Sequence, residues 1–254
     1  MSNILYSSAN GVAIITLNRP EKHNAFDDAT LAELKKNLLQ AEQDETVRVV
    51  ILDAKGKSFS AGADLAWMQR MVDYSHDENL QDAQILSTTL KTLNNLSKPT
   101  IAKVQGNAYG GALGLISCCD IAIACHHTHF CFSEVKLGLI PATISPYVIH
   151  AIGPRAARRY FLTGETFDAA TALNLHLIQE TAAPDELDSL TQAIANDILQ
   201  NCPSATALCK KLISDVQDKP IDDQLINDTC QRIASIRTSD TAQERLRDFL
   251  NKKG

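Results

Sequence analysis

Several features that would assign this chain to a special class are missing from its sequence. No apolar run approaches the roughly 20 residues that a membrane helix needs, so we expect no membrane span. No run of basic residues is longer than the closing pair Lys252–Lys253 and the net charge is −6, so we expect no nucleic-acid partner. The first residues lack a basic segment followed by an apolar one, which a secretory signal would require.

The cysteines do not suggest a disulfide framework. There are seven, an odd number, irregularly spaced in a chain of 254 residues that is long enough to build its own core. Reduced thiols and a cytoplasmic location are therefore expected. Cys125, Cys131 and the three histidines between them match no common zinc spacing, so we expect a polar loop between two strands and no metal.

Local patterns predict an α/β protein. Asn10-Gly11 favours a two-residue hairpin turn within residues 5–18, and Asp27 or Asp28 can cap an amphipathic helix. A second long helix is expected over residues 80–96 and a shorter one over 110–119. The expected buried strands, rich in β-branched residues, are 47–52, 100–104 and 121–124. This alternation predicts a mostly parallel sheet covered by helices.

Helical patterns dominate after Pro141. The expected helical segments are 155–163, 167–174, 184–200, 203–216, 219–236 and 240–252. No linker rich in glycine or serine interrupts them. We divide the chain into a core over residues 1–195 and a helical C-terminal region over residues 196–254.

Two loops carry small residues directly after predicted strands. Gly106, Gly110, Gly111 and Gly114 fall within nine residues at the start of a helix, where backbone amides can approach an anion. Tight packing of a helix on a sheet explains these glycines equally well. The second loop spans residues 59–65 and exposes amides in the same way. Both loops would meet at the carboxyl end of the sheet, where open α/β sheets bind ligands.

Four sequence runs occur in order along the chain: LNRPEKHNAF (17–26), FSAGADL (59–65), GNAYGGA (106–112) and SEVKLGLIP (133–141). Together they resemble the successive signatures of the crotonase (enoyl-CoA hydratase/isomerase) superfamily. The likeness continues through residues 153–158 and 162–165, so it covers essentially the whole chain. It implies an α/β fold, a spiral of β-β-α units, with a C-terminal helical region that forms homotrimers or hexamers made of two trimers.

The resemblance also implies chemistry on an acyl-CoA, with coenzyme A entering as part of the substrate and no separate cofactor. The amides of Ala63 and Gly111 match the oxyanion hole that binds the thioester carbonyl. Such donors contribute roughly 3–4 kcal/mol each at comparable sites. Glu134 matches a catalytic carboxylate, and an apolar cleft around it would raise its pKa. Substrate contacts are implied at Lys22, His23, Ala25, Ala61, Asp64, Leu65, Trp67, Gly110, Gly114 and Ala142.

One position departs from the two-carboxylate hydratases of this superfamily, because Gly114 stands where they carry a second Glu. Residues 63–68, 110–120 and 141–146 resemble a bacterial subgroup named for methylglutaconyl-CoA and geranoyl-derived dicarboxylic acyl-CoAs, in leucine and terpene breakdown. We therefore favour a hydratase of a branched or dicarboxylic enoyl-CoA, such as 3-methylglutaconyl-CoA, whose acyl chain would fill the space that Gly114 leaves. The alternatives are a 3-enoyl-CoA to 2-enoyl-CoA isomerase that uses Glu134 alone, and a catalytically silent acyl-CoA-binding protein.

Two further sets of side chains are weaker candidates. Asp120 could replace the missing carboxylate, although a turn or hydrogen-bonding role is the default at the end of a helix. A distal carboxylate of the substrate would need a guanidinium partner. The candidates are Arg70, Arg155, Arg158 and Arg159, and the Lys252–Lys253 tail could meet the phosphates of coenzyme A.

Overall fold

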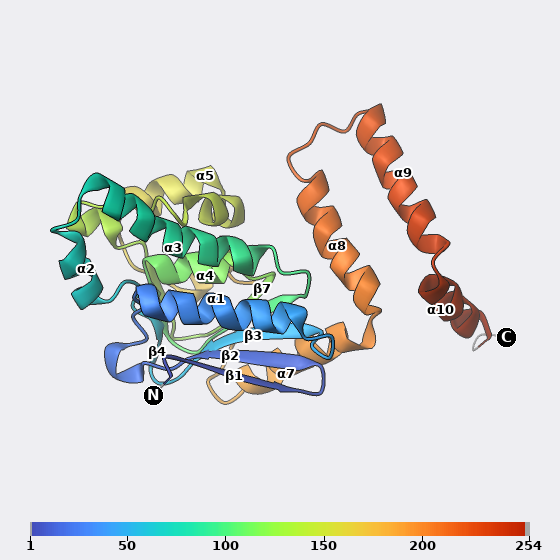
Figure 1. Ribbon diagram of the computed structural model, residues 1–254, viewed down its shortest axis with the longest axis horizontal. Coiled ribbons are helices and arrows are strands. Elements are labelled where there is room, and N and C mark those ends of the chain that lie inside the picture. Colours follow the sequence, from blue (N-terminus) through green and yellow to red (C-terminus); the bar gives the residue numbers. More distant parts are fainter. Residues whose placement is uncertain (1, 252–254) are drawn as a thin grey trace. The chain divides into compact units, whose positions relative to one another are not determined.

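Pairs of strands, each followed by a helix, build the N-terminal part of the chain in the computed structural model, which describes residues 2–251 (Figure 1). The larger sheet has the strand order β1-β2-β3-β5-β7-β10. Its strands are β1 (Ile4–Ala9), β2 (Val12–Leu17), β3 (Val49–Ala54), β5 (Thr100–Val104), β7 (Ile121–Cys125) and β10 (Glu180–Ala182). Within this sheet the hairpin pair β1-β2 is antiparallel and the other described pairs are parallel. The predicted parallel sheet is confirmed.

A smaller sheet has the order β4-β6-β8-β9. Its strands are β4 (Ser58–Ser60), β6 (Asn107–Tyr109), β8 (His129–Cys131) and β9 (Phe167–Asp168). Each of β3, β5 and β7 in the larger sheet is followed along the chain by β4, β6 or β8 in the smaller one, and then by a helix. Because neighbours in both sheets come from successive repeats, the chain winds as the predicted spiral of β-β-α units.

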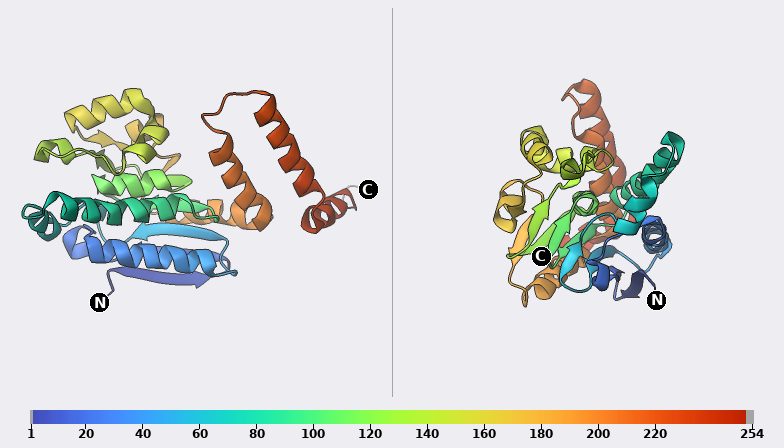
Figure 2. Two further views of the ribbon diagram at one scale, coloured as in Figure 1. Left: turned by 45° about the horizontal axis from the view of Figure 1, so that its top comes forward. Right: turned by 90° about the vertical axis from the view of Figure 1, so that its left-hand side faces the viewer.

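Helices cover both faces of the larger sheet (Figures 1 and 2). The helices of this part are α1 (Asp28–Gln43), α2 (Leu65–Met71), α3 (His76–Asn94), α4 (Gly111–Cys118), α5 (Ser145–Thr163), α6 (Ala169–Asn174) and α7 (Leu187–Gln200). On β3, Val50 and Leu52 face the core shared with α1, α3 and α4, whereas Val49 and Ile51 face α7. The nearly continuous apolar sequence of this strand reflects burial on both sides.

Residues 1–201 and 202–254 form two separate compact units. Residue 195, where we divided the sequence, lies inside α7, and the structural division comes after that helix. The second unit contains α8 (Pro203–Val216), α9 (Asp223–Arg237) and α10 (Asp240–Asn251). Within residues 2–251, no helix has both the length and the apolar character to cross a membrane.

Candidate active site

The loop between β4 and α2 contains a backbone N–H group that makes no hydrogen bond to the described residues. Its neighbours are engaged: Ala61 N donates to His23 O (2.9 Å), Gly62 N to Ser60 Oγ (3.1 Å) and Asp64 N to Phe26 O (2.9 Å). Among the described residues, the N–H of Ala63 has no acceptor. The loop is thus pinned on both sides of a single free donor.

A second spare amide belongs to Gly111, at the start of α4. The first N–H groups of a helix have no acceptor within the helix, and within the described part of the chain that of Gly111 has none elsewhere. The two loops touch, because a β-carbon placed on Gly62 would lie 2.7 Å from Tyr109 O and 3.7 Å from Gly111 N. Two preorganised donors from adjacent loops suit an oxygen that gains negative charge.

The Glu134 carboxyl lies against the second loop. Its Oε1 is 3.2 Å from the point where a β-carbon on Gly110 would sit, so a residue larger than glycine at 110 would press on it. Its Oε2 is buried and has no hydrogen-bond partner within residues 2–251. Burial raises the pKa of Glu134, which is the predicted direction. A carboxyl with a raised pKa, next to the loop that carries the Gly111 amide, can exchange a proton with a bound thioester.

The space expected beside Gly114 does not exist. A β-carbon there would lie 2.9 Å from Ile144 Cβ, closer still to Ile144 Cγ2, and 3.3 Å from Leu90 Cδ2. Ile144 is 1 % exposed, so its side chain belongs to the core. The prediction that a branched acyl chain fills a vacancy at Gly114 is wrong, because Ile144 fills it.

Asp64 is a buried structural anion rather than a group turned toward a substrate. Its Oδ1 accepts from Ala66 N (2.8 Å) and caps α2, while its Oδ2 accepts from Arg19 Nη2 (2.9 Å) and Lys22 Nζ (3.0 Å). Burial alone would raise the pKa of Asp64, but these bonds and the Arg19 charge outweigh it and hold the pKa at about 2. The network fixes the residue that follows the Ala63 amide.

The sequence motifs contain Arg19, but we assigned it no role. Its guanidinium donates to Ala25 O (2.8 Å) as well as to Asp64, so it ties the first motif to the loop that carries Ala63. Its place directly before Pro20 in a motif, with an acidic residue in the next motif, is the signal that could have identified it. Lys22, predicted as a substrate contact, forms an ion pair with the same carboxylate.

The remaining predicted substrate contacts are scattered. Trp67 is buried and donates from Nε1 to Asp82 Oδ1 (2.7 Å), which joins α2 to α3. Leu65 is 82 % exposed. His23 lies with Nδ1 3.2 Å from Ser58 Oγ, and Ala61 and Ala142 are exposed. The structure therefore brings together Ala63, Gly110, Gly111 and Glu134, whereas Trp67, Asp64 and Gly114 are packed in the interior.

The weaker candidate Asp120 has an ordinary explanation. Asp120 Oδ2 accepts from the backbone N (2.7 Å) and hydroxyl (2.9 Å) of Thr100, so it ties α4 to β5. Residues 126–128 form the predicted loop between β7 and β8. The Lys252–Lys253 pair lies outside the described residues.

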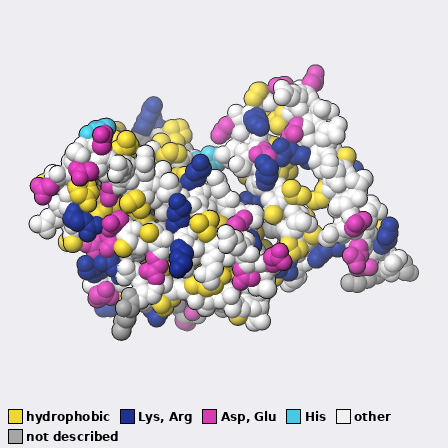
Figure 3. Space-filling view, viewed as in Figure 1, with side chains coloured by type: hydrophobic (Ala, Val, Ile, Leu, Met, Phe, Trp, Pro, Cys, Tyr) yellow, Lys and Arg dark blue, Asp and Glu magenta, His cyan; other side chains and the backbone are white. Residues whose placement is uncertain are grey.

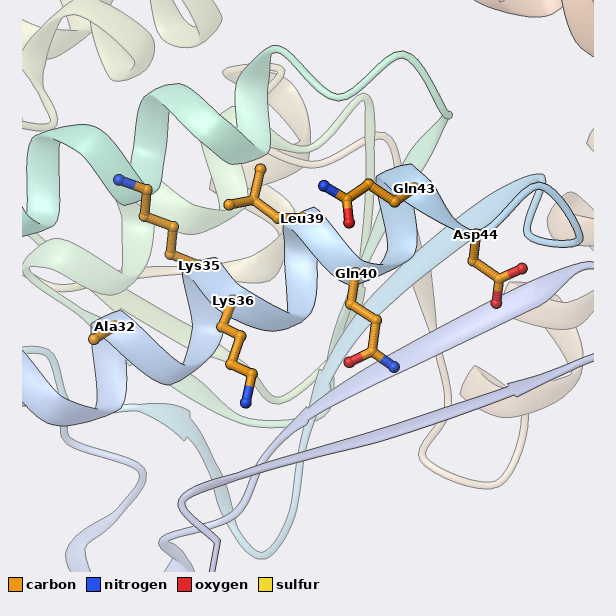
Figure 4. Close-up of a pocket in the computed structure, with 7 residues that line it drawn as sticks. All are labelled: Ala32, Lys35, Lys36, Leu39, Gln40, Gln43 and Asp44. Atoms are coloured by element: carbon orange, nitrogen blue, oxygen red, sulfur yellow. The ribbon is translucent and has the colours of Figure 1, made fainter.

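A hollow of about 680 Å³ on the outer side of α1 is unrelated to these groups. Figure 4 shows that its side chains come from α1 and from Asp44, the residue after it. They include Lys35, Lys36 and Leu39, none of which is a predicted site residue. An open hollow without converging polar groups lacks the features of a reaction site.

Comparison with known proteins agrees with this geometry. The family model for enoyl-CoA hydratase/isomerase matches residues 7–254. A crystal structure of an enoyl-CoA hydratase from Shewanella pealeana is 46% identical, with a TM-score of 0.95 over 98% of this chain and 94% of that chain.

Two curated relatives show both reaction types of the family. The short-chain-enoyl-CoA hydratase of Clostridium acetobutylicum is 33% identical over 84% of this chain and 82% of its own. The trans-2-decenoyl-[acyl-carrier-protein] isomerase of Streptococcus mutans is 31% identical over 83% of this chain and 81% of its own. The chain thus belongs to the enoyl-CoA hydratase/isomerase family, within the crotonase superfamily, and is an enzyme of that family.

Proposed function

We propose that this enzyme adds water across the 2,3 double bond of an enoyl-CoA, with Glu134 as its only catalytic carboxylate. The observation that carries the proposal is the Glu134 carboxyl, whose Oε1 faces Gly110, the residue before the Gly111 amide, and whose Oε2 is buried without a partner among the described residues. Substrate enters with its coenzyme A, and the reaction moves only protons and water. We therefore propose that it needs no further cofactor, and prior dialysis against a chelator should leave the rate unchanged.

The residues have distinct roles in this reaction. The amides of Ala63 and Gly111 donate to the thioester oxygen and stabilise its negative charge as the enolate forms, by roughly 3–4 kcal/mol each. Glu134 takes a proton from water as the water oxygen bonds to C3. A proton then passes from the carboxyl to C2, which restores the carboxylate and the thioester carbonyl. A pKa above the ordinary range suits a group that both accepts and returns a proton.

For the acyl group we propose a branched or dicarboxylic chain such as 3-methylglutaconyl, on the likeness of residues 63–68 and 141–146 to that subgroup. The space beside Gly114 no longer supports this choice. Of the four candidate arginines, Arg70 pairs with Asp28 (2.6 Å) and Arg159 with Glu165 (2.6 Å). Arg155 and Arg158 line a hollow of about 670 Å³ on α5 and remain candidates for a distal carboxylate.

Isomerisation of 3-enoyl-CoA to 2-enoyl-CoA is the second candidate. It is favoured by the hydrocarbon of Ile144 where a second carboxylate would be, because moving one proton between two carbons needs a single carrier. Crotonyl-CoA, 3-methylglutaconyl-CoA and a 3-enoyl-CoA should be offered in parallel, with products identified by mass spectrometry. Formation of a hydroxyacyl-CoA supports the hydratase. Double-bond migration without hydration refutes it and leaves the isomerase.

We further propose that the C-terminal unit joins copies of the chain into a homotrimer or a hexamer. None of α8, α9 and α10 has a buried residue among those described. Figure 3 shows hydrophobic side chains on the surface of these helices. The exposed large ones are Leu208, Ile213, Ile226, Ile233, Leu246, Phe249 and Leu250, and Ile221 is exposed in the loop between α8 and α9. Apolar faces of this kind mark association surfaces, and light scattering of the purified protein measures the number of chains.

A further inference from the structure

Ile144 and α3 together cover the face of α4 that starts at the oxyanion amide. A β-carbon on Gly111 would lie 3.6 Å from Leu86 Cδ2, and one on Gly114 would lie 3.3 Å from Leu90 Cδ2. Positions 111 and 114 share a face of the helix, about 4.5 Å apart along its axis. A side chain at 114 would therefore project beside the carbons that follow the thioester carbonyl, were Ile144 not there.

Ile144 cannot easily yield this space. Its Cβ, fixed by the backbone, is 2.9 Å from the β-carbon position of residue 114. Its carbonyl accepts from the amides of Tyr147 (3.1 Å) and Val148 (3.0 Å), which anchor the start of α5. A branched β-carbon is stiff about χ1, so rotation does not clear the contact. Any side chain at 114 would have to push the first turn of α5 outward.

We propose that Ile144 is the specificity-determining residue that confines this enzyme to one-carboxylate chemistry. It excludes every side chain, and so every carboxylate, from the α4 wall one turn beyond the oxyanion amide. The proposal rests on the function proposed above, in which Glu134 alone handles the proton. Gly114 and Ile144 depend on each other, because the Ile144 side chain occupies the space that any β-carbon at position 114 would need.

The packing half of the proposal is tested without any activity measurement. Gly114→Ala should lower the thermal unfolding midpoint by roughly 5–10 °C, because overpacking a filled core is costly in a chain of this length. In an Ile144→Gly background the same exchange should cost little or raise the midpoint. Ile152, which is 8 % exposed on the same helix, supplies the matched control, since Ile152→Gly should give no such relief. Equal losses from Gly114→Ala in all three backgrounds would overturn the proposal.

The chemical half uses a carboxylate placed in the cleared space. Gly114→Glu with Ile144→Gly should hydrate crotonyl-CoA at least 10-fold faster than the matched Gly114→Gln with Ile144→Gly, and its pH–rate profile should show a second ionisation. Gly114→Glu alone should melt lower than the double variant. Equal rates and profiles for the folded Glu and Gln double variants would overturn the specificity role. If the parent enzyme instead fails to hydrate any 2-enoyl-CoA, the proposed function falls while the melting comparison still decides the packing.

Discussion

Replacing Asp64 with Asn tests whether the buried ion network holds the Ala63 amide in place. Asn retains an oxygen that can cap α2, but it removes the negative charge next to Arg19, whose side chain is 11% exposed. Asp27 remains 3.4 Å from Arg19 and compensates only part of that charge. The substitution therefore separates the charge pair from the helix cap.

The loss of stability follows from the pKa. Asp64 titrates at 3.8 ordinarily and at about 2 in the fold, despite burial, which raises it, because Lys22, Ala66 and Arg19 favour the charged form. That difference corresponds to about 2 kcal/mol at neutral pH. The part of the buried Arg19 charge that Asp27 does not compensate adds to the cost, so we expect a total of about 2–4 kcal/mol. Because the pKa of Asp64 is lower in the folded state, its carboxylate stabilises the fold above about pH 4. This contribution to the free energy of unfolding falls by about half at pH 3.

Urea unfolding at pH 7 measures this loss, and initial rates on an enoyl-CoA report the Ala63 amide. We expect kcat/KM to fall about 10-fold or more, because a displaced donor no longer meets the thioester oxygen. Asp168 is the control: it caps α6 through Thr171 N (2.8 Å) at an exposed site, so Asp168→Asn should cost only a few tenths of a kcal/mol. Equal stability and activity for the two variants would refute the positioning role of Asp64.

Three other outcomes follow from the site. Glu134→Gln should reduce turnover roughly 10²–10⁴-fold while acyl-CoA binding, measured by calorimetry, persists; near-parental turnover would remove Glu134 from the mechanism. The same variant should have a higher melting temperature than the parent at pH 8 and an equal one at pH 4. A carboxyl whose pKa is raised in the folded state destabilises the fold only when the pH rises above its ordinary pKa. The same difference in melting temperature at both pH values would contradict the burial of Glu134. Gly111→Val should fold poorly or lose activity, since even a β-carbon there would lie 2.8 Å from Phe26 Cζ. A crystal structure with acyl-CoA whose thioester oxygen lies beyond ~3.3 Å from both amide nitrogens would refute the oxyanion hole.

Local chemistry predicted the first elements well. Asn10 (φ 52°) and Gly11 (φ 84°) form the turn between β1 and β2, where Ala9 pairs with Val12. Asp27 caps α1 by accepting from Thr30 N (2.8 Å). Residues close in sequence determine these features, so a sequence pattern is enough to find them.

The elements that depend on distant partners were missed or misplaced. β9 and β10 are too short to show alternation, and they exist because β8 and β7 provide edges for them. We expected a helix only from residue 155 onward. The helix begins at Ser145 and continues across a kink at Gly153 (φ 74°). Pro146 suits its first turn, and this was the available signal.

The same division applies to the site. Motifs were enough to predict Glu134 and the two amide loops as site residues, because each motif is contiguous in the sequence. Arg19 and Asp64 are 45 positions apart, and Gly114 and Ile144 are 30 apart. Their contacts arise only when the spiral closes, so composition and spacing could not reveal that the glycine is covered.

The smaller sheet sets the spacing of the three groups that we propose for catalysis. Ala63, Gly111 and Glu134 follow the ends of β4, β6 and β8, three adjacent strands whose spacing of about 4.8 Å is fixed by main-chain hydrogen bonds. The pairing of these strands therefore sets the backbone positions of the three residues, and most side-chain substitutions should leave those positions unchanged. A change of length should therefore disrupt the proposed site. One residue inserted between any of these strands and the residue that follows it would shift that residue, while the strands themselves stay paired.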